Sequence, residues 1–571
     1  MIKSIKQFKE KLYFIITNKD KIDIRNVLFF GFIIGLFELV GLTLIVAMIQ
    51  IFTNFSIVES NTILNYIFVN FASNKVISFV LLVSLVISVF YTIKLILSIW
   101  NAKLMAKLAA NLYLNISKKL FENYLNYYYR DFAKKNTAEI NQMLILESDS
   151  LALMVSNIIY LIIHTVILCL LYAYMVYIDY ILTSFVTIFI LFLAILYKKS
   201  LNQKLVLMGE DRIKALRVYM KLIKSSFNNY KFIKSLDGNY ISTNLEKSTN
   251  NFKKARVNML YWSEVPKLIL EFSVIIIMIS ILLFIKLKYD SSEQLLVVVS
   301  AYALTLFRML PSLSRILNSV NMISQYKKTL DMVHLEFKYK SEPIVKYFKI
   351  NFNNSIDINK ICFLYPDAEN ESLKDVSLTI PKGEKLAIIG ESGSGKSTLM
   401  DIIIGFHLPT KGLVSIDNLT LNDKNISNWR RNISFVPQKV ILFESSIKEN
   451  ITFGKAYNEK LFKQVLEDVY MYDVVMEKGG AEAKVGDEVS GFSGGQMQRL
   501  AIARALYQEK EILFLDESTS SLDEELELEI IDNIINKYQD KTIIAIVHKK
   551  SISKKFDRII QIDNGKIVEE I

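Results

Sequence analysis

The sequence predicts a multi-domain membrane protein, in which a helical domain of six membrane spans precedes an α/β domain. Of the 571 residues, 52% are hydrophobic, and this length allows two or three domains. The apolar residues concentrate before about residue 325, whereas short β-rich runs and a glycine-rich loop follow from about residue 346. We therefore expect a transmembrane domain over residues 1–335 and a nucleotide-binding domain over residues 346–571.

Six apolar stretches are long enough to cross a bilayer, which takes about 20 helical residues. They are Val27–Phe52, Val76–Trp100, Leu153–Ile178, Ile181–Tyr197, Leu268–Ile285 and Leu295–Leu317. The connection Thr53–Asn74 between the first two spans has apolar residues at helical spacing. It predicts a short helix outside the membrane.

The charged residues orient these spans. The net charge is +11. Lys and Arg gather in the N-terminal segment, between spans two and three, and between spans four and five. Spans three and four are joined through Asp179-Tyr180, with no basic residue. Because basic connections stay in the cytoplasm, we expect both termini there. The basic excess is thereby explained by the membrane, and nucleic acid is not expected as a partner.

The two long cytoplasmic connections are expected to prolong the spans as helices. Leu104, Leu108 and Leu112 recur every four residues, as on one face of a helix. Turns are expected near Gln142–Ser150 and Lys221–Asn229.

Several charged residues lie inside the spans, where a charge costs roughly 2.5–3.5 kcal/mol on insertion scales and needs a reason. One interpretation is structural: Glu38 or Glu271 pairs with a nearby base, while Lys94 and Arg315 reach the membrane interface. The other is functional: Lys94, Arg308 and Arg315 line a cavity that accepts an anionic headgroup. The sequence leaves both open.

A phosphate-binding loop is the most specific motif of the second part. The strand Leu386–Ile389 runs into the loop, and a helix opens at Thr398. The loop residues are Gly390, Glu391, Ser392, Gly393, Ser394, Gly395, Lys396 and Ser397. Glycines let backbone N–H groups converge on a phosphate, Lys396 neutralises phosphate charge, and Ser397 offers its hydroxyl to Mg²⁺. This pattern predicts ATP and Mg²⁺ as ligands.

Further polar residues follow apolar strands of the same domain. The strand Ile512–Glu517 ends in two carboxylates, of which Asp516 is suited to hold Mg²⁺ and Glu517 to accept a proton from attacking water. Gln438 follows the strand Ile433–Val436 and is suited to sense Mg²⁺ and the γ-phosphate. His548 ends the strand Thr542–Val547, where it can donate to the γ-phosphate.

With these motifs the chain resembles the ABC transporter superfamily, specifically exporters with six spans per subunit. The resemblance implies an ABC nucleotide-binding domain in which Tyr365 stacks on adenine and Glu517, Gln438 and His548 are catalytic, with Ser397, Gln438 and Asp516 at the metal. It implies that the signature residues Ser493, Gly494, Gly495 and Gln496 cover ATP bound by a second copy, in a homodimer. Ser520–Asp523 is the implied D-loop, and Val485–Glu488 an implied contact loop.

Two positions depart from the family pattern. Phe492 stands where leucine usually precedes the signature, and Lys549 where arginine usually follows the histidine. Neither removes a catalytic group, so we expect hydrolysis of ATP rather than binding alone. This disfavours the alternative of a regulatory or channel-like ABC protein, and the spans disfavour a soluble ABC ATPase.

Within the exporters, the chain resembles bacterial flippases for lipid-linked oligosaccharides, which are polyprenyl-pyrophosphate glycans. The run Phe307–Ile316, the segment Asn228–Lys234 and Glu38 carry this resemblance. It implies an amphipathic glycolipid substrate, with Lys94, Arg308 and Arg315 at its headgroup, and a multi-pass protein of the bacterial inner membrane. The alternative is a lipid A-type or multidrug exporter.

Overall fold

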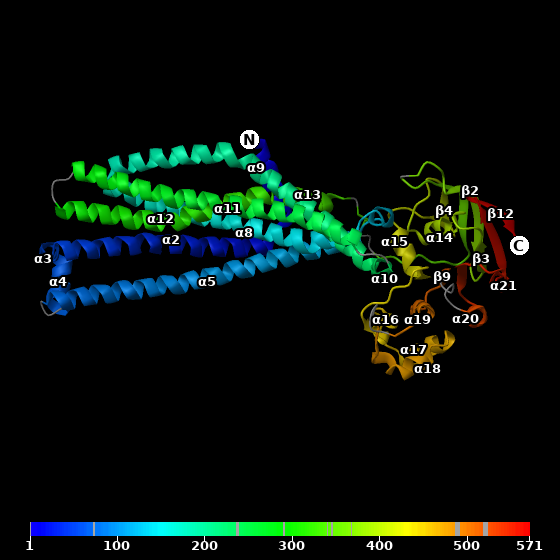
Figure 1. Ribbon diagram of the computed structural model, residues 1–571. Coiled ribbons are helices and arrows are strands. Elements are labelled where there is room, and N and C mark those ends of the chain that lie inside the picture. The colour runs from blue at the N-terminus through cyan, green and yellow to red at the C-terminus, as the bar shows by residue number, and fades with distance from the viewer. Residues whose placement is uncertain are drawn as a thin grey trace. The chain divides into compact units, whose positions relative to one another are not determined.

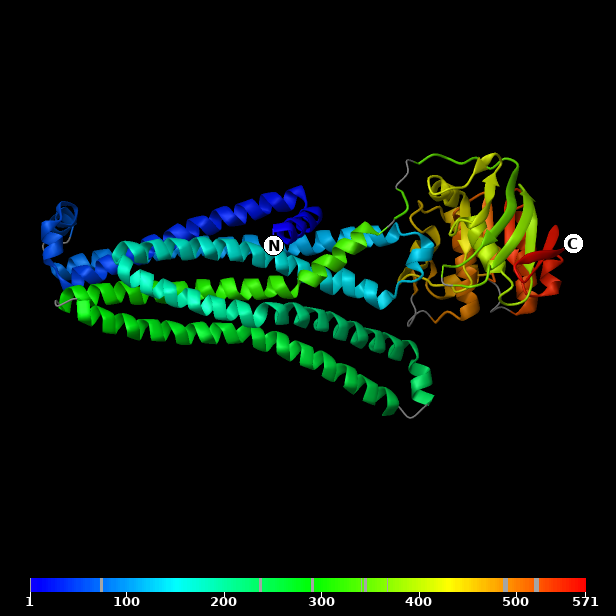
Figure 2. The same ribbon diagram turned by 90° about the horizontal axis from the view of Figure 1, so that it is seen from above.

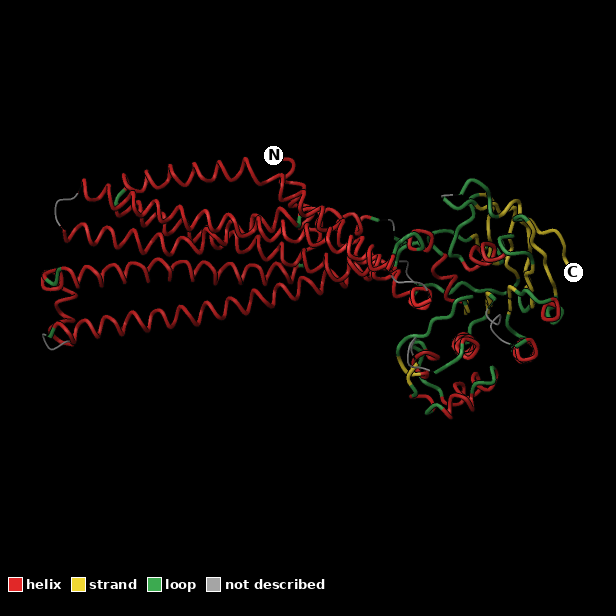
Figure 3. Tube along the Cα trace, viewed as in Figure 1, coloured by secondary structure: helices red, strands yellow, loops and turns green. Residues whose placement is uncertain are grey.

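The computed structural model describes residues 2–71, 75–235, 239–288, 292–339, 341–343, 347–366, 368–485, 491–517 and 523–571. By its internal contacts the chain divides into two units (Figures 1 and 3). The first, the helical unit, comprises Met1–Leu125 and Lys135–Tyr339. The second comprises Asn126–Lys134 and Lys340–Ile571, and we name it the ATPase unit after the activity that the sequence predicts for it.

The helical unit is built from long helices joined by short connections. Its elements are α1 (Ile2–Ile15), α2 (Asn18–Thr53), α3 (Ser56–Ser60), α4 (Thr62–Phe71), α5 (Val76–Leu125), α7 (Thr137–Asn141), the π-helix η1 (Gln142–Glu147), α8 (Ser148–Ile178), α9 (Tyr180–Asn228), α10 (Tyr230–Ser235), α11 (Asn239–Lys288), α12 (Ser292–Gln325) and α13 (Lys327–Lys338). Figures 1 and 2 show α9 and α11 side by side, with α10 at their turn.

Within the described residues, five helices are long and apolar enough to cross a membrane. They contain the first, second, third, fifth and sixth predicted spans. The remaining prediction, Ile181–Tyr197, lies at the start of α9, whose side chains at residues 189–206 are outside the described ones. The helices α5 and α11 have 50 residues each, far more than a bilayer needs. The expected prolongation of spans as helices is therefore confirmed.

The first expected turn, Gln142–Ser150, is wrong. Residues Gln142–Glu147 form a π-helix that continues into α8, and the chain reverses earlier, around α6 (Tyr129–Phe132). The reason lies in burial. Gln142 and Glu147 are 1% and 0% exposed and hydrogen-bond to each other, so this polar stretch faces the interior of the helical unit.

Glycines bring α2 close to α8. A Cβ on Gly31 would lie 2.6 Å from Ile163, and one on Gly35 would lie 3.1 Å from Ile167. Because lipid tails are as apolar as leucine, membrane helices associate through such close packing between small and large residues. The contact places Glu38 of α2 in a defined position inside the unit.

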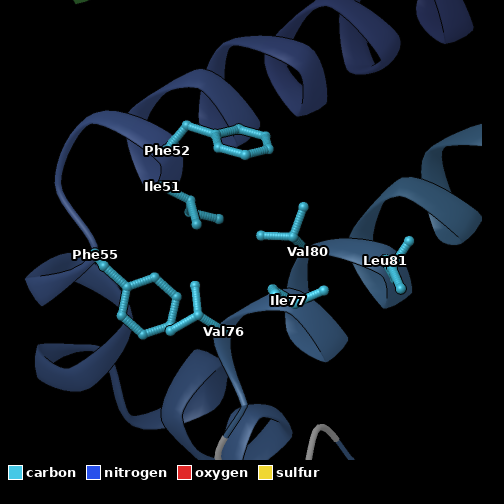
Figure 4. A pocket seen from close by; sticks show the side chains of 7 residues that line it. All are labelled: Ile51, Phe52, Phe55, Val76, Ile77, Val80 and Leu81. Carbon is cyan, nitrogen blue, oxygen red and sulfur yellow. The ribbon is translucent and has the colours of Figure 1, made fainter.

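The predicted helix between spans one and two is confirmed as α4. Phe55, Phe68 and Phe79 meet edge to face next to it, with ring centres 5.1 to 6.1 Å apart. Beside this cluster, an apolar hollow of about 270 Å³ lies between the end of α2 and the start of α5 (Figure 4). It is lined by Ile51, Phe52, Phe55, Val76, Ile77, Val80 and Leu81.

The ATPase unit contains two main sheets. An antiparallel sheet has the order β2-β1-β4-β5, and a six-stranded sheet has the order β12-β11-β3-β10-β9-β6. The strands are β1 (Ser355–Phe363), β2 (Leu373–Pro381), β3 (Lys385–Ile389), β4 (Lys411–Ile416), β5 (Leu419–Thr420), β6 (Ile433–Val436), β9 (Ile512–Asp516), β10 (Thr542–Ile546), β11 (Arg558–Asp563) and β12 (Lys566–Glu570). A small ribbon pairs β7 (Ser445–Ser446) with β8 (Lys484–Val485).

Helices complete the ATPase unit. Besides α6, its described α-helices are α14 (Lys396–Ile404), α15 (Ile426–Trp429), α16 (Ile447–Thr452), α17 (Glu459–Asp468), α18 (Tyr472–Glu477), α19 (Gly494–Tyr507), α20 (Glu524–Lys537) and α21 (Lys550–Ser553). Figure 1 shows α16 to α18 gathered in a lobe beside the sheets. In the larger sheet β6, β9, β10, β3 and β11 run parallel, so their carboxyl ends meet at one edge, where ligands of such sheets bind.

The segment Asn126–Lys134 belongs to the ATPase unit although it lies between α5 and α7 in the chain. The Asn126 carbonyl accepts from the Glu342 backbone N–H at 2.7 Å. Tyr127 forms a β-bridge with Ser341. The segment is therefore tied to the residues that lead into β1, an arrangement that the sequence did not predict.

Candidate nucleotide site

The glycine-rich loop follows β3, as predicted, and α14 begins at its end. All three of its glycines have positive φ, with +149° at Gly390, +84° at Gly393 and +110° at Gly395. A Cβ on Gly390 would lie 2.2 Å from the Ile562 carbonyl oxygen, and one on Gly395 would lie 2.7 Å from the Ser372 carbonyl oxygen. Only glycine permits this path, which closes the loop tightly around the start of α14.

Lys396 is the first residue of α14, and its side chain contacts the start of this loop. Its side chain is buried, and its Nζ donates to the carbonyl oxygens of Gly390 and Glu391 at 2.9 and 2.8 Å. The ammonium is thus held against the carbonyls of the loop that leads into α14, and the N-terminus of α14 carries positive partial charge. The two effects together make a site for anionic phosphate.

The sheet topology brings the other predicted residues to the same edge. Asp516 and Glu517 end β9, which lies between β10 and β6. Glu517 accepts from Gln438 Nε2 at 2.5 Å through one oxygen, and its other oxygen lies 2.5 Å from His548 Nε2. Glu517 itself has φ +46°, a backbone strain that costs on the order of 1–3 kcal/mol and is typical of functional sites.

Asp516 fits a divalent cation. Its Oδ1 is buried and, within the described part of the chain, has no hydrogen-bond partner. Burial and the neighbouring Glu517 carboxylate raise the pKa of Asp516 to about 6. Burial and the Asp516 charge raise the pKa of Asp401, on α14, to about 7. An orphaned carboxylate oxygen among other carboxylates is the environment that a hard cation such as Mg²⁺ relieves.

Tyr365, just after β1, reaches the phosphate loop. Its hydroxyl lies 3.2 Å from Thr398 Oγ1. Its ring packs against Phe363 and His407, with ring centres 4.9 and 5.6 Å away. His407 in turn packs edge to face on Tyr129, at 5.6 Å. The sequence predicted Tyr365 but missed His407, whose only signal was its place three residues after α14.

The predicted signature residues form the N-terminus of α19. Ser493 Oγ accepts from the Gln496 backbone N–H at 3.2 Å, and Gln496 Oε1 accepts from the Ser493 N–H at 2.9 Å. This capping box fixes the helix start, and Ser493 and Gly494 stay exposed. Of the implied D-loop only Asp523 is described, and of Val485–Glu488 only Val485.

The charged residues of the spans are arranged in two groups. Glu38 pairs with both Lys94 and Arg308, so the pairing that the sequence left open holds for Glu38. Arg315 stacks on the Tyr160 ring, 4.0 Å from its centre. Neither Arg315 nor Glu271 takes part in an ion pair with another described residue.

A further buried carboxylate, Glu147, was not predicted. It is 0% exposed and accepts from Thr329 Oγ1 at 2.7 Å and from Gln142 Nε2 at 2.9 Å, and it pairs with Arg212 at 3.2 Å. The π-helix makes this possible, because its i→i+5 pattern brings residues five apart to one face. Glu147 thus joins η1, α9 and α13.

Residues 373–520 match the family model described as ABC transporter. They hold the phosphate loop, the signature and both carboxylates at the end of β9. Residues 373–520 are therefore similar to an ABC transporter domain. Domains of this family use ATP with Mg²⁺ and couple ATP hydrolysis to transport.

Solved and curated proteins resemble longer parts of the chain. An ATP-bound bacterial Atm1-family ABC exporter superposes on 96% of this chain and 95% of its own, with a TM-score of 0.81 and 17% identity. The predicted fold class, a helical apolar domain followed by an α/β ABC domain, is thereby confirmed.

Among curated proteins, the heterocyst differentiation ATP-binding protein HepA of Nostoc is 34% identical over 46% of this chain and 44% of its own length. The ATP-dependent lipid A-core flippase of Wigglesworthia glossinidia brevipalpis is 37% identical over 41% of each. The lactococcin G processing and transport protein LagD of Lactococcus lactis is 38% identical over 38% of this chain and 31% of its own. The chain thus spans less than half the length of these relatives.

Proposed function

We propose that the protein is an ATP-driven exporter of the bacterial inner membrane, with both termini in the cytoplasm. The observation that carries this proposal is the position of Glu517, held between Gln438 and His548 at the edge where the phosphate loop opens. A carboxylate in this place can take the proton of the water that attacks the γ-phosphate. His548 and Gln438 orient it and can turn to the phosphate when ATP binds.

The remaining nucleotide contacts follow from the same geometry. Lys396, whose ammonium is satisfied by loop carbonyls, would exchange them for phosphate oxygens. Tyr365, backed by Phe363 and His407, would stack on adenine. Mg²⁺, held by Asp516, Ser397 and Gln438, would neutralise phosphate charge when bound.

The signature supports a homodimer. Ser493 and Gly494 present an exposed helix N-terminus, which is suited to binding a phosphate. Each chain carries one such signature helix and one phosphate loop. A second copy would supply the signature to the first copy's ATP. ATP binding would then close the two ATPase domains, and hydrolysis would reset the transporter.

For the substrate we propose a lipid-linked oligosaccharide, whose pyrophosphate is recognised from α12. Arg308 and Arg315 lie seven residues apart on this helix, which places them on one face about 10 Å apart. Arginine binds phosphate groups in bidentate fashion. The apolar hollow at the outer end of α2 and α5 (Figure 4) is suited to hydrocarbon.

A lipid A-type substrate is the second candidate, and the relative named a lipid A-core flippase supports it. Both candidates are glycolipids with phosphate groups, so the same arginines would serve either one. They differ in the tail, which is a single polyprenyl chain in one and several acyl chains in the other.

The test is ATP hydrolysis by the full chain in lipid nanodiscs, with and without a polyprenyl-pyrophosphate oligosaccharide. We expect this lipid to stimulate the wild-type protein, and Arg308→Ala to lose the stimulation while keeping basal hydrolysis. Stimulation by lipid A alone would move the substrate to the second candidate. Equal loss of basal and stimulated hydrolysis in Arg308→Ala would instead assign Arg308 a role in folding.

A further inference from the structure

Glu38, Lys94 and Arg308 form one charged cluster inside the helical unit, contributed by α2, α5 and α12. The Glu38 carboxylate pairs with the Lys94 ammonium through Oε2, and its Oε1 lies 3.3 Å from Arg308 Nη1. Two cations therefore share one carboxylate. The side chains of Lys94 and Glu38 are 13% and 14% exposed, whereas that of Arg308 is 36% exposed, so an arriving ligand meets Arg308 first.

An aromatic ring holds both cations independently of Glu38. Lys94 Nζ lies 5.4 Å and Arg308 Cζ 5.6 Å from the centre of the Tyr91 ring. This ring lies against Gly41, where a Cβ would be 2.9 Å from Tyr91 Oη. A cation near an aromatic face is attracted by the ring quadrupole. Loss of the carboxylate alone would thus leave both cations in place.

We infer that Glu38 is a specificity-determining residue. Its carboxylate keeps singly charged lipids from binding Arg308, whereas a multiply charged phosphate headgroup displaces it from Arg308. The inference rests on the proposed transport of an anionic glycolipid. An anion that binds Arg308 through Nη1 has to displace Glu38, which is part of the same chain and is therefore always present at high effective concentration. Whether a lipid headgroup binds Arg308 therefore depends on whether it interacts with the guanidinium more strongly than the Glu38 carboxylate does.

A phosphodiester lipid carries one charge, no more than the carboxylate that it would replace. A pyrophosphate or bisphosphate carries two or more charges, and its oxygens match the guanidinium fork. Anionic lipids surround every inner-leaflet site, so an arginine without a counter-ion would be occupied by them. Glu38 prevents singly charged lipids from occupying Arg308, so that only a headgroup with two or more negative charges displaces it.

Lys94 ensures that Glu38 keeps a counter-ion when Arg308 binds a headgroup instead. When Arg308 turns to a headgroup, Glu38 stays paired with Lys94, the less exposed of its two partners. Arg315, two turns further along α12, takes part in no described ion pair and is stacked on Tyr160. It offers the headgroup a cation for which no carboxylate competes.

The experiment titrates two lipids into neutral nanodiscs that hold the full chain, and measures ATP hydrolysis. The probes are phosphatidylglycerol, which has one charge, and farnesyl pyrophosphate, which has several. We expect the wild type to respond to the pyrophosphate at a mole fraction at least tenfold lower than to phosphatidylglycerol. In Glu38→Gln this ratio should fall to about threefold or less.

The matched control is Glu271→Gln, which removes another span carboxylate and should keep the wild-type ratio. An unchanged ratio in Glu38→Gln, or the same change in both variants, would overturn the inference. Should Glu38→Gln fail to fold, Glu38→Asp, which shortens the side chain, should shift the ratio in the same direction by less; no shift there would overturn it equally.

A failure of the proposed function would give a different result from a failure of this inference. If the wild type responds to neither lipid, the substrate proposal falls, and the inference is decided by lipid retention. Phosphatidylglycerol that remains bound through purification from a mixed bilayer is counted by mass spectrometry. We expect several-fold more of it on Glu38→Gln than on the wild type and Glu271→Gln; equal amounts would overturn the role of Glu38.

Discussion

Replacing Glu147 with glutamine should destabilise the helical unit, because it leaves the Arg212 guanidinium without its counter-ion. The Glu147 side chain is wholly buried and that of Arg212 is 14% exposed. Removing one partner of a buried pair costs about 3–5 kcal/mol. At roughly 2 °C per kcal/mol, the low end for large domains, this corresponds to a fall in Tm on the order of 6–10 °C.

The assay is thermal loss of helical circular dichroism in the nucleotide-free protein. Glu139→Gln is the control, since Glu139 pairs with Arg217 at 3.8 Å with both side chains more than 40% exposed. Such surface pairs contribute about 0–1 kcal/mol. A second variant replaces both Glu147 and Arg212 with methionine and should recover part of the loss, because no unpaired charge remains although Thr329 and Gln142 lose their acceptor. A fall of less than about 2 °C in Glu147→Gln would refute the reasoning.

Three further predictions concern the ATPase unit. Glu517→Gln should lower ATP turnover about 10²–10⁴-fold while retaining ATP in a closed dimer, and normal turnover would remove Glu517 from the catalytic role. Asp401→Asn should raise the Tm without Mg²⁺ and nucleotide, with a gain that grows from pH 4 to about pH 7 and then levels off. The reason is that the raised pKa of Asp401, about 7, makes its ionisation destabilise the fold as pH rises; a gain that shrinks with pH would contradict this. His407→Ala should raise the KM for ATP about two- to tenfold with kcat little changed, because one aromatic contact of Tyr365 contributes about 0.5–1.5 kcal/mol; an unchanged KM would count against that support.

The nucleotide site was largely predictable because its chemistry is local in sequence. A loop that binds phosphate needs a strand before it and a helix after it, and β3 and α14 fall there. Gln438, Glu517 and His548 each follow a strand, and parallel strands end at one edge of a sheet. To predict that these three residues lie together, only the strand order was still needed. In the structure β9 lies between β6 and β10.

The residues that were missed depend on distant partners. His407 packs on Tyr129, which comes from the connection after α5, and no local pattern links the two positions. The turn expected near Gln142–Ser150 was misplaced for the same reason. Polar residues usually favour turns, but here Gln142 and Glu147 are satisfied by each other and by residues from α9 and α13.

Exposure separates two paired carboxylates of the helical unit, Glu147 and Glu38, into different roles. Glu147 pairs with Arg212, and neither side chain is more than 14% exposed. A competing anion therefore has no access to this pair, whose role is to stabilise the helical unit. Glu38 has one partner, Arg308, that is 36% exposed, and a second, Lys94, that keeps its charge balanced. A carboxylate with one accessible and one inaccessible cation can release the first without being left unpaired. Glutamine at residue 147 should therefore change stability, whereas glutamine at residue 38 should change which anions stimulate hydrolysis.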